Sequence, residues 1–105
     1  MICLGIETTA HTFGVGLITS EGKILANAKA VYTPPLGKGI IPAEAAQHHE
    51  KHKEEVLEQA LKNANLTLED VDVIGYSAGP GLPLPLTVGA TFAHKLAESS
   101  GKPLK

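Results

Sequence analysis

Three histidines and a glutamate lie within the segment Gln47–His52, and this composition could bind a metal ion. Neutral imidazoles four residues apart on a helix, as His48 and His52 are, can share a zinc ion. The zinc-protease signature His-Glu-x-x-His is absent, because the segment His49–His52 is one residue short of it. At about 100° per residue, His49 falls on the apolar stripe of the helix, His48 points nearly opposite and His52 lies on the flank. The pattern therefore favours a histidine-rich helix over a metal site.

The first half of this apolar stripe carries His49 and Lys53, which dry protein cores rarely accept. Two interpretations remain open. Either the start of the helix faces a wet cleft or a partner, or the stem of Lys53 runs past the edge of the core and places its ammonium group in water.

A second polar group follows the first apolar run of the chain. Glu7, Thr8 and Thr9 stand where a predicted strand ends and small residues lead into a hairpin. Backbone N–H groups and hydroxyls at such a tip can donate to phosphate oxygens, while the carboxylate orients a metal ion or a water molecule. The alternative is an ordinary polar hairpin tip.

The segment Ser77–Leu82, with the sequence Ser-Ala-Gly-Pro-Gly-Leu, lies between a predicted strand and a predicted helix. Gly79 and Gly81 would allow close backbone approach, and crevices at the carboxyl ends of strands are where α/β proteins bind ligands. The segment is neither a Walker loop nor a Gly-x-Gly-x-x-Gly motif, so a purely structural tight turn is the alternative.

Hydrophobic periodicity and turn residues predict an α/β chain that positions these segments. An antiparallel meander of three strands is followed by a loop, a long helix, a capped turn, a buried strand and a second helix. The predicted bounds are Ile2–Ile6, Phe13–Thr19 and Ile24–Tyr32 for the meander, Thr33–Ile41 for the loop, Pro42–Ala64 for the first helix, Thr67–Asp70 for the turn, Val71–Ser77 for the fourth strand and about Leu86 to Ser99 for the second helix. Pro103–Lys105 looks like the start of another strand. The predicted order is therefore β-β-β-α-β-α, truncated before its last strand.

Composition narrows the class of protein. The 105 residues suffice for one domain and are too few for two. Hydrophobic residues make up 43% and charged residues 19%, so disorder is not expected. A net charge of −2 without a basic block does not suggest a nucleic-acid-binding surface. The single cysteine, Cys3, excludes an internal disulfide, and we expect a cytoplasmic chain with no signal peptide and no membrane helix.

Three motifs occur together in this chain: GIETTAHTFGVG at Gly5–Gly16, PAEAAQHH at Pro42–His49 and SAGPGL at Ser77–Leu82. In order and spacing they resemble the N-terminal lobe of the archaeal and eukaryotic-type tRNA threonylcarbamoyladenosine synthase, the catalytic subunit of the KEOPS complex. This family was formerly called O-sialoglycoprotein endopeptidases. The resemblance covers essentially the whole chain and is closest to the archaeal branch.

The resemblance implies a ribonuclease-H-like lobe of the actin-like ATPase, or ASKHA, fold. Residues 1–105 would form an incomplete N-terminal lobe, with the second lobe absent. The implied reaction transfers the threonylcarbamoyl group from threonylcarbamoyl-AMP to the adenosine next to the tRNA anticodon. Glu7 is the expected catalytic residue, and Thr8, Thr9, Gly79 and Gly81 are expected on the loops at the nucleotide or phosphate side.

The resemblance also implies cofactors and partners. Full-length members carry one divalent metal ion, iron or zinc, and bind ATP or threonylcarbamoyl-AMP. The metal-binding His-x-x-x-His pair follows the segment at which this chain ends, so we expect no metal, no cofactor and no catalysis for the chain alone. A small dimerising KEOPS subunit is expected to dock on the two helices near Ala90, Phe92, Ala93 and Leu96. The KEOPS kinase subunit and tRNA are the other expected partners.

Two departures from the family pattern bear on activity. Thr8 replaces a glycine common in archaeal relatives, and Thr87 stands where the family usually has an arginine. One alternative is therefore a non-catalytic interaction module that keeps the docking helices. Another is an ASKHA kinase acting on a small metabolite, in which aspartate would be more usual at the position of Glu7. Without a final strand, Val71–Ser77 would form an exposed sheet edge, which favours self-association or partner binding.

Overall fold

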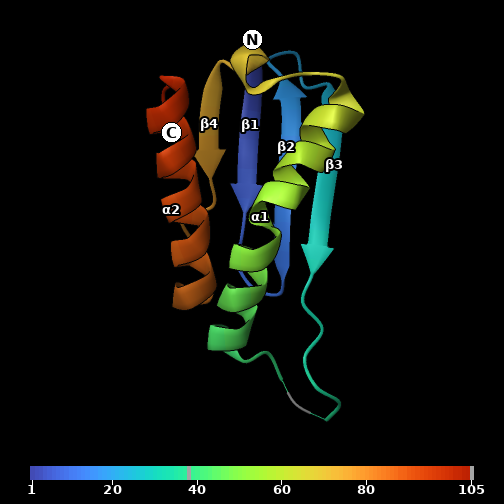
Figure 1. Cartoon of the computed structure of the whole chain (residues 1–105), viewed down its shortest axis with the longest axis vertical. Coiled ribbons are helices and arrows are strands. Elements are labelled where there is room, and N and C mark those ends of the chain that lie inside the picture. Colours follow the sequence, from blue (N-terminus) through green and yellow to red (C-terminus); the bar gives the residue numbers. More distant parts are fainter. Residues whose placement is uncertain (38, 105) are drawn as a thin grey trace.

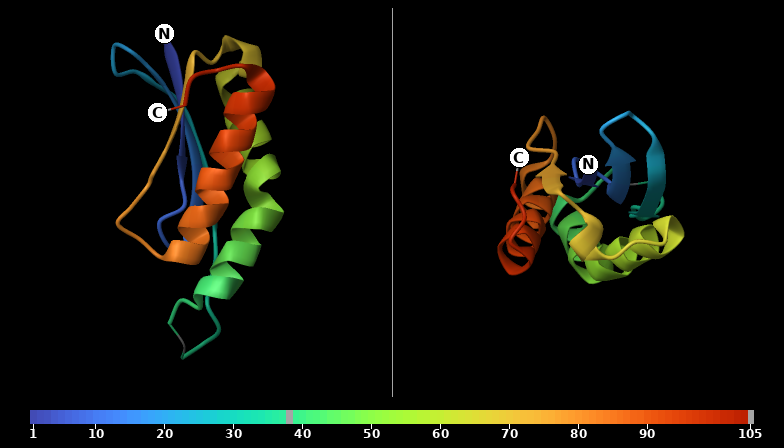
Figure 2. Two further views of the ribbon diagram at one scale, coloured as in Figure 1. Left: turned by 90° about the vertical axis from the view of Figure 1, so that its left-hand side faces the viewer. Right: turned by 90° about the horizontal axis from the view of Figure 1, so that it is seen from above.

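The computed structural model describes residues 1–37 and 39–104 as a four-stranded sheet with two long helices on one of its faces (Figure 1, Figure 2). The elements are β1 Ile2–Glu7, β2 Thr12–Thr19, β3 Ile24–Val31, α1 Pro42–Ala64, the short 3₁₀ helix η1 Leu68–Asp70, β4 Val73–Tyr76 and α2 Pro83–Ser100. The predicted order β-β-β-α-β-α is confirmed. Lys38 in the predicted loop and Lys105 in the predicted last strand lie outside the described residues.

The sheet has the strand order β3-β2-β1-β4. The first three strands are antiparallel, as predicted, and β4 joins β1 in parallel. Because parallel strands end at the same edge of a sheet, Glu7 and the segment after Tyr76 are brought together. β4 lies at the sheet edge, as expected. Pro103 and Leu104 begin a further pairing there: the N–H of Ile74 donates to the Pro103 carbonyl at 2.9 Å, and Ile74 forms an isolated parallel bridge with Leu104.

Side chains alternate across the strands, so each strand has one face toward the helices and one away from them. The core lies between the sheet and the helices, and its fully buried members include Leu4, Phe13, Val15, Leu17, Ala60, Ile74 and Ala93. On the opposite face, Gly5 of β1 pairs with both Gly16 of β2 and Gly75 of β4. A row of glycines therefore crosses three strands on the helix-free face.

Helix α1 begins and ends where the sequence predicts. Pro42 stands in its first turn, where a missing N–H removes no helical hydrogen bond, and Glu44 lies near the positive helix end. Asn65 ends the helix in a left-handed conformation with φ of 57°. The next N–H, of Leu66, donates to the Leu61 carbonyl at 2.9 Å and closes the cap.

Two predicted bounds are wrong, and the others agree with the structure or differ from it by one residue. α2 begins at Pro83 rather than near Leu86, because prolines are tolerated in the first turn, whose N–H groups have no helical acceptor. β4 is shorter than Val71–Ser77, because the Val71 N–H donates to the Leu68 carbonyl at 3.2 Å as the cap of η1. The capped turn itself is confirmed by the capping box of Thr67 with Asp70.

Candidate functional site

Glu7 ends β1 and opens a loop of four residues, Glu7–Ala10, which we call the strand-tip loop. Its carboxylate oxygen Oε1 accepts a hydrogen bond from the N–H of Thr9 at 2.8 Å and another from the Thr9 hydroxyl. Within the part of the chain that the structure describes, the second oxygen, Oε2, has no hydrogen-bond partner. The loop therefore fixes one carboxylate oxygen and leaves the other available.

The strand-tip loop is hydrogen-bonded to the glycine turn, Ser77–Leu82, as the parallel pairing of β1 with β4 requires. The Thr8 N–H donates to the Ser77 hydroxyl at 3.3 Å, and the Leu82 N–H donates to the Thr9 carbonyl at 2.8 Å. A Cβ on Gly81 would lie 2.6 Å from the Thr9 carbonyl oxygen. The group that lies close to Gly81 is this chain's own backbone, which agrees with a structural tight turn; approach of a ligand stays a prediction.

Gly79 also needs to be glycine, because its φ of 147° is a conformation that side chains rarely adopt. Thr9 thus lies against Glu7, and Gly81 lies against Thr9. Their contact with a nucleotide or a phosphate stays a prediction.

The Thr8 side chain lies elsewhere. It is 1% exposed, and its Oγ1 has no hydrogen-bond partner among the residues described. Thr8 follows Glu7 directly, so strand alternation sends its side chain to the helix side, where it packs on Gly89 of α2. The expectation that its hydroxyl faces a phosphate is corrected: this hydroxyl is inside the fold.

Glu7 itself lies on the helix-free face and lines a groove of about 540 Å³. Thr12 and Lys29 line the groove as well, and Gly5, Gly14 and Gly16 form part of its wall. Glycines leave the sheet backbone open to close approach by a flat group. Sequence reasoning missed Thr12 and Lys29, although the glycines at alternate positions of β2 signalled an unfilled sheet face.

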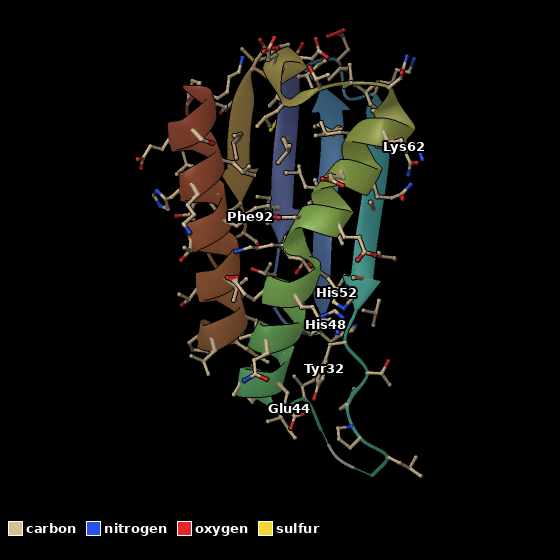
Figure 3. All side chains as sticks on the ribbon, in the orientation of Figure 1. Tyr32, Glu44, His48, His52, Lys62 and Phe92 are labelled. Atoms are coloured by element: carbon tan, nitrogen blue, oxygen red, sulfur yellow. The ribbon has the colours of Figure 1, made fainter. Side chains whose placement is uncertain are left out.

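The three histidines of α1 form a cluster with Tyr32. Figure 3 shows His48, His52 and Tyr32 at the same end of the sheet. The His48 ring lies 4.4 Å from the His52 ring, 5.3 Å from the His49 ring and 5.9 Å from the Tyr32 ring, measured between centroids. The prediction that these rings point in different directions is wrong. A helical wheel gives the direction of Cα–Cβ bonds, whereas long side chains on adjacent turns can bend toward each other.

His49 is fully buried, in contact with the Phe13 ring at a centroid distance of 5.9 Å. Burial is the main reason that the pKa of His49 is lowered. Burial also lowers the pKa of His48, and the nearby His52 and His49 rings lower it further. Burial, followed by the hydrogen bond to Glu44, raises the pKa of Tyr32, whose hydroxyl donates to Glu44 Oε1 at 2.9 Å. These shifts favour the neutral form of all three side chains. Among the described residues, no group of three or more His, Cys, Asp or Glu converges to hold a metal ion.

The contacts of Lys53 bear on the two interpretations of the first half of the α1 stripe. Its side chain is 17% exposed, and its ammonium group bonds both carboxylate oxygens of Glu50 at 2.8 and 2.7 Å. The same nitrogen lies 5.4 Å from the centre of the Phe92 ring. With His49 fully buried as well, the geometry agrees with a lysine stem along the core edge, while a partner beside Lys53 stays a prediction.

The predicted docking residues of α2 divide into two groups. Ala90 and Leu96 are partly exposed, so a docking role for them stays a prediction. Phe92 is 5% exposed and Ala93 is fully buried. Both residues are part of the chain's own core. Ala93 has no exposed surface to offer a partner, whereas Phe92 also lines a groove between the helices, so a docking role for Phe92 stays a prediction. The sequence pattern missed the burial of both residues because apolar residues on a helix are common to cores and interfaces.

Residues 23–105 match a family model described as tRNA N6-adenosine threonylcarbamoyltransferase. The chain belongs to this family. Curated relatives of that name include one from Methanopyrus kandleri, 55% identical over 104 residues, and one from Pyrobaculum islandicum, 50% identical over 104 residues. The alignments cover 99% of this chain but only 30% and 31% of those relatives. The chain thus spans about a third of the length of the family members that it matches.

Solved structures confirm the fold predicted from the sequence. YeaZ from Pseudomonas aeruginosa superposes with a TM-score of 0.74 at 19% identity, over 98% of this chain and 41% of that one. Thermus thermophilus RuvC superposes with a TM-score of 0.55 at 15% identity, over 99% of this chain and 59% of that one. The chain has the ribonuclease-H-like α/β fold of the ASKHA type. Neither helix in residues 1–37 and 39–104 has the length and apolar character of a membrane span.

Proposed function

We propose that this chain is the N-terminal lobe of a tRNA N6-adenosine threonylcarbamoyltransferase and that it contributes the Glu7 carboxylate to the reaction. The observation that carries the proposal is 55% identity over nearly the whole chain to a relative of which the chain spans 30%. For the whole protein we propose transfer of threonylcarbamoyl from threonylcarbamoyl-AMP to the adenosine beside the tRNA anticodon. The chain alone is proposed to be inactive, because a second lobe is needed to enclose the adenylate.

Glu7 has the geometry of a proton acceptor. In the proposed step, the exocyclic nitrogen of adenosine attacks the carbonyl carbon of the threonylcarbamoyl group, the bond from that carbon to the phosphate oxygen of AMP breaks, and the nitrogen loses a proton. Thr9 holds Oε1 of Glu7 with two donors, so Oε2 is oriented and available to receive this proton or to align the amine.

The cofactors proposed for the whole protein are one divalent metal ion, iron or zinc, and the adenylate or ATP. The metal is not assigned to this chain, since within the described residues no set of three or more suitable side chains converges. The groove beside Glu7 has an open backbone wall on which part of a nucleotide could lie. Every role assigned here to Glu7 and Thr9 is independent of the metal.

Glu7→Gln tests the proposal in the full-length protein that contains this lobe. We expect the rate of threonylcarbamoyl transfer to fall about a hundredfold, the typical loss when an acid–base group is removed. The measurement is incorporation of labelled threonine into tRNA from threonylcarbamoyl-AMP. Glu21→Gln, an exposed carboxylate in the β2–β3 turn, is the matched control and should leave the rate unchanged. A Glu7→Gln enzyme within twofold of the wild-type rate would exclude this role.

A second candidate function is partner docking through the helices. A groove of about 550 Å³ lies against α1 and α2 and is lined by Lys53, Glu54, Phe92, Lys95, Glu98 and Ser99. We propose that the small dimerising KEOPS subunit binds here, while the kinase subunit and tRNA bind the full-length protein. The edge of β4 beyond its pairing with Pro103 and Leu104 is the proposed surface for self-association, since strand edges can pair with another chain.

Lys95→Glu tests docking without disturbing the core, because Lys95 is exposed. Reversal of a charge in the groove should weaken binding of the small subunit about tenfold, as expected for a lost charge contact. Titration calorimetry of the purified chain with that subunit gives the dissociation constant. Lys23→Glu in the β2–β3 turn is the control for net charge. Equal affinities for the two variants would show that the subunit binds elsewhere.

A further inference from the structure

His49 has no part in the proposed transfer, yet it connects α1 to the strand-tip loop. Its Nε2 lies 2.9 Å from the carbonyl oxygen of Ala10, the last residue of the loop that begins with Glu7. A carbonyl oxygen only accepts hydrogen bonds, so Nε2 of His49 must carry the proton. A residue 39 positions away in the sequence therefore fixes one end of this loop.

The neighbouring histidine determines which nitrogen of His49 is protonated. Nδ1 of His48 lies 3.2 Å from Nδ1 of His49. A neutral His49 with its proton on Nε2 has a lone pair on Nδ1, so Nδ1 of His48 must be the donor. The result is a directed chain of hydrogen bonds from His48 to His49 and from His49 to the Ala10 carbonyl.

The surroundings of His49 keep it neutral. The ring is fully buried and packs on Phe13. The titratable groups facing it are Glu7 and His11 from the strand-tip side, and His48 and His52 on α1. Burial has the largest influence on the pKa of His49 and lowers it. The hydrogen bond to Ala10 and the charge of Glu7 oppose this shift, but the pKa of His49 is still lowered overall.

We propose that His49 is a positioning residue for Glu7 and that His48 selects the tautomer in which His49 holds the Ala10 carbonyl. The importance of Glu7 rests on the proposed function, but the hydrogen-bond geometry does not. Fixing Ala10 at one end and Thr9 in the middle limits the positions open to the loop, and Thr9 in turn holds Oε1 of Glu7.

Nitrogen-15 NMR of the 105-residue chain tests the proposal directly. At neutral pH we expect His49 protonated on Nε2 only and His48 protonated on Nδ1 only. The opposite tautomer of His49, or fast exchange between the two tautomers, would overturn the proposal. This measurement uses the wild-type chain, so it does not depend on any variant folding.

Substitution of His49 then tests the positioning role. His49→Gln keeps an N–H donor for Ala10, whereas His49→Leu keeps the volume and removes the donor. Amide hydrogen exchange of Thr9 should accelerate about tenfold in His49→Leu, equivalent to one lost hydrogen bond, and less than twofold in His49→Gln. Glu58→Leu, at an exposed position of the same helix, is the control and should leave this amide unchanged. Equal acceleration in the Leu and Gln variants would mean that His49 only fills space.

The pH dependence gives a third readout. The unfolded chain takes up the proton of an ordinary histidine near pH 6.5, while folded His49 resists it. Stability contributed by His49 is therefore complete above about pH 6.5 and is lost as the pH falls below it. In His49→Gln the free energy of unfolding should depend less steeply on pH below about pH 6.5. The same pH dependence in this variant and the wild type would count against a buried neutral His49.

The two proposals fail separately. If Glu7→Gln keeps full transfer activity while the tautomers are as expected, the proposed role of Glu7 is wrong and the loop geometry stands. If Glu7→Gln abolishes transfer while His49 has the opposite tautomer, only the positioning role is wrong.

Discussion

Phe92→Asp is expected to lower the free energy of unfolding by at least about 4 kcal/mol, most of the stability of a domain of this size. Phe92 is 5% exposed, and its ring lies 6.0 Å from the Phe13 ring between centroids. Removal of a buried aromatic ring alone costs about 3–5 kcal/mol. The aspartate adds a carboxylate at a position that is only 5% exposed.

Lys53 cannot offset this cost, because its ammonium group is already paired with both oxygens of Glu50. Urea unfolding followed by far-ultraviolet circular dichroism measures the effect. Thr91→Asp places the same charge on the adjacent, exposed position of α2 and should change stability by less than about 0.5 kcal/mol. If the two variants were equally stable, Phe92 would have to be an exposed residue, contrary to the structure.

This result bears on how partner binding is tested. A Phe92→Asp chain that no longer binds the small subunit would be unfolded, so the loss of binding would not identify the docking surface. Lys95→Glu separates the two effects, since Lys95 is exposed and lines the same groove. Phe92→Leu, which keeps an apolar side chain of lower volume, should retain both the fold and the binding.

The fold was predictable from the sequence because its determinants are local. Alternating apolar residues specify the strands of the meander, and Pro42 and Asn65 mark the ends of α1. The predicted start of α2 is wrong because Pro83 and Pro85 favour a loop in the sequence pattern, although both fit a first helical turn. A proline fits either a loop or the first turn of a helix, and only the contacts of the following residues decide between these two structures.

The site was predictable only in part, because its contacts join residues far apart in the chain. The strand-tip loop and the glycine turn were recognised by composition, and the parallel pairing of β1 with β4 brings them together. The hydrogen bond from His49 to Ala10 has no local signal. A helical wheel placed His49 correctly on the apolar face, but it could not show that Ala10 was the partner that makes burial of an imidazole acceptable.

Gly89→Ala is expected to destabilise the chain by about 1–3 kcal/mol, although alanine is the better helix former by about 1 kcal/mol. Gly89 is buried in α2. A Cβ at this position would lie 2.2 Å from Oγ1 of Thr8 and 3.0 Å from its Cγ2. Thr8 is β-branched and 1% exposed, so it has little freedom to move aside. The overlap therefore outweighs the gain in helix propensity.

Gly89→Ala should change the free energy of unfolding in the opposite direction when residue 8 is glycine. Thr8→Gly removes the atoms that the new Cβ would meet, and Gly89→Ala should then stabilise the chain by up to about 1 kcal/mol. Urea unfolding of the four chains of this double-mutant cycle should give a coupling energy of about 2–3 kcal/mol. Thr91→Ala, an exposed position of α2, is the control for helix propensity alone.

A Gly89→Ala effect that is the same in both backgrounds would show that Thr8 is not the obstacle. In this chain Thr8 and Gly89 must change together, because strand alternation sends the side chain after Glu7 directly into α2. The contact thereby couples the residue next to Glu7 to the helix that borders the proposed docking groove.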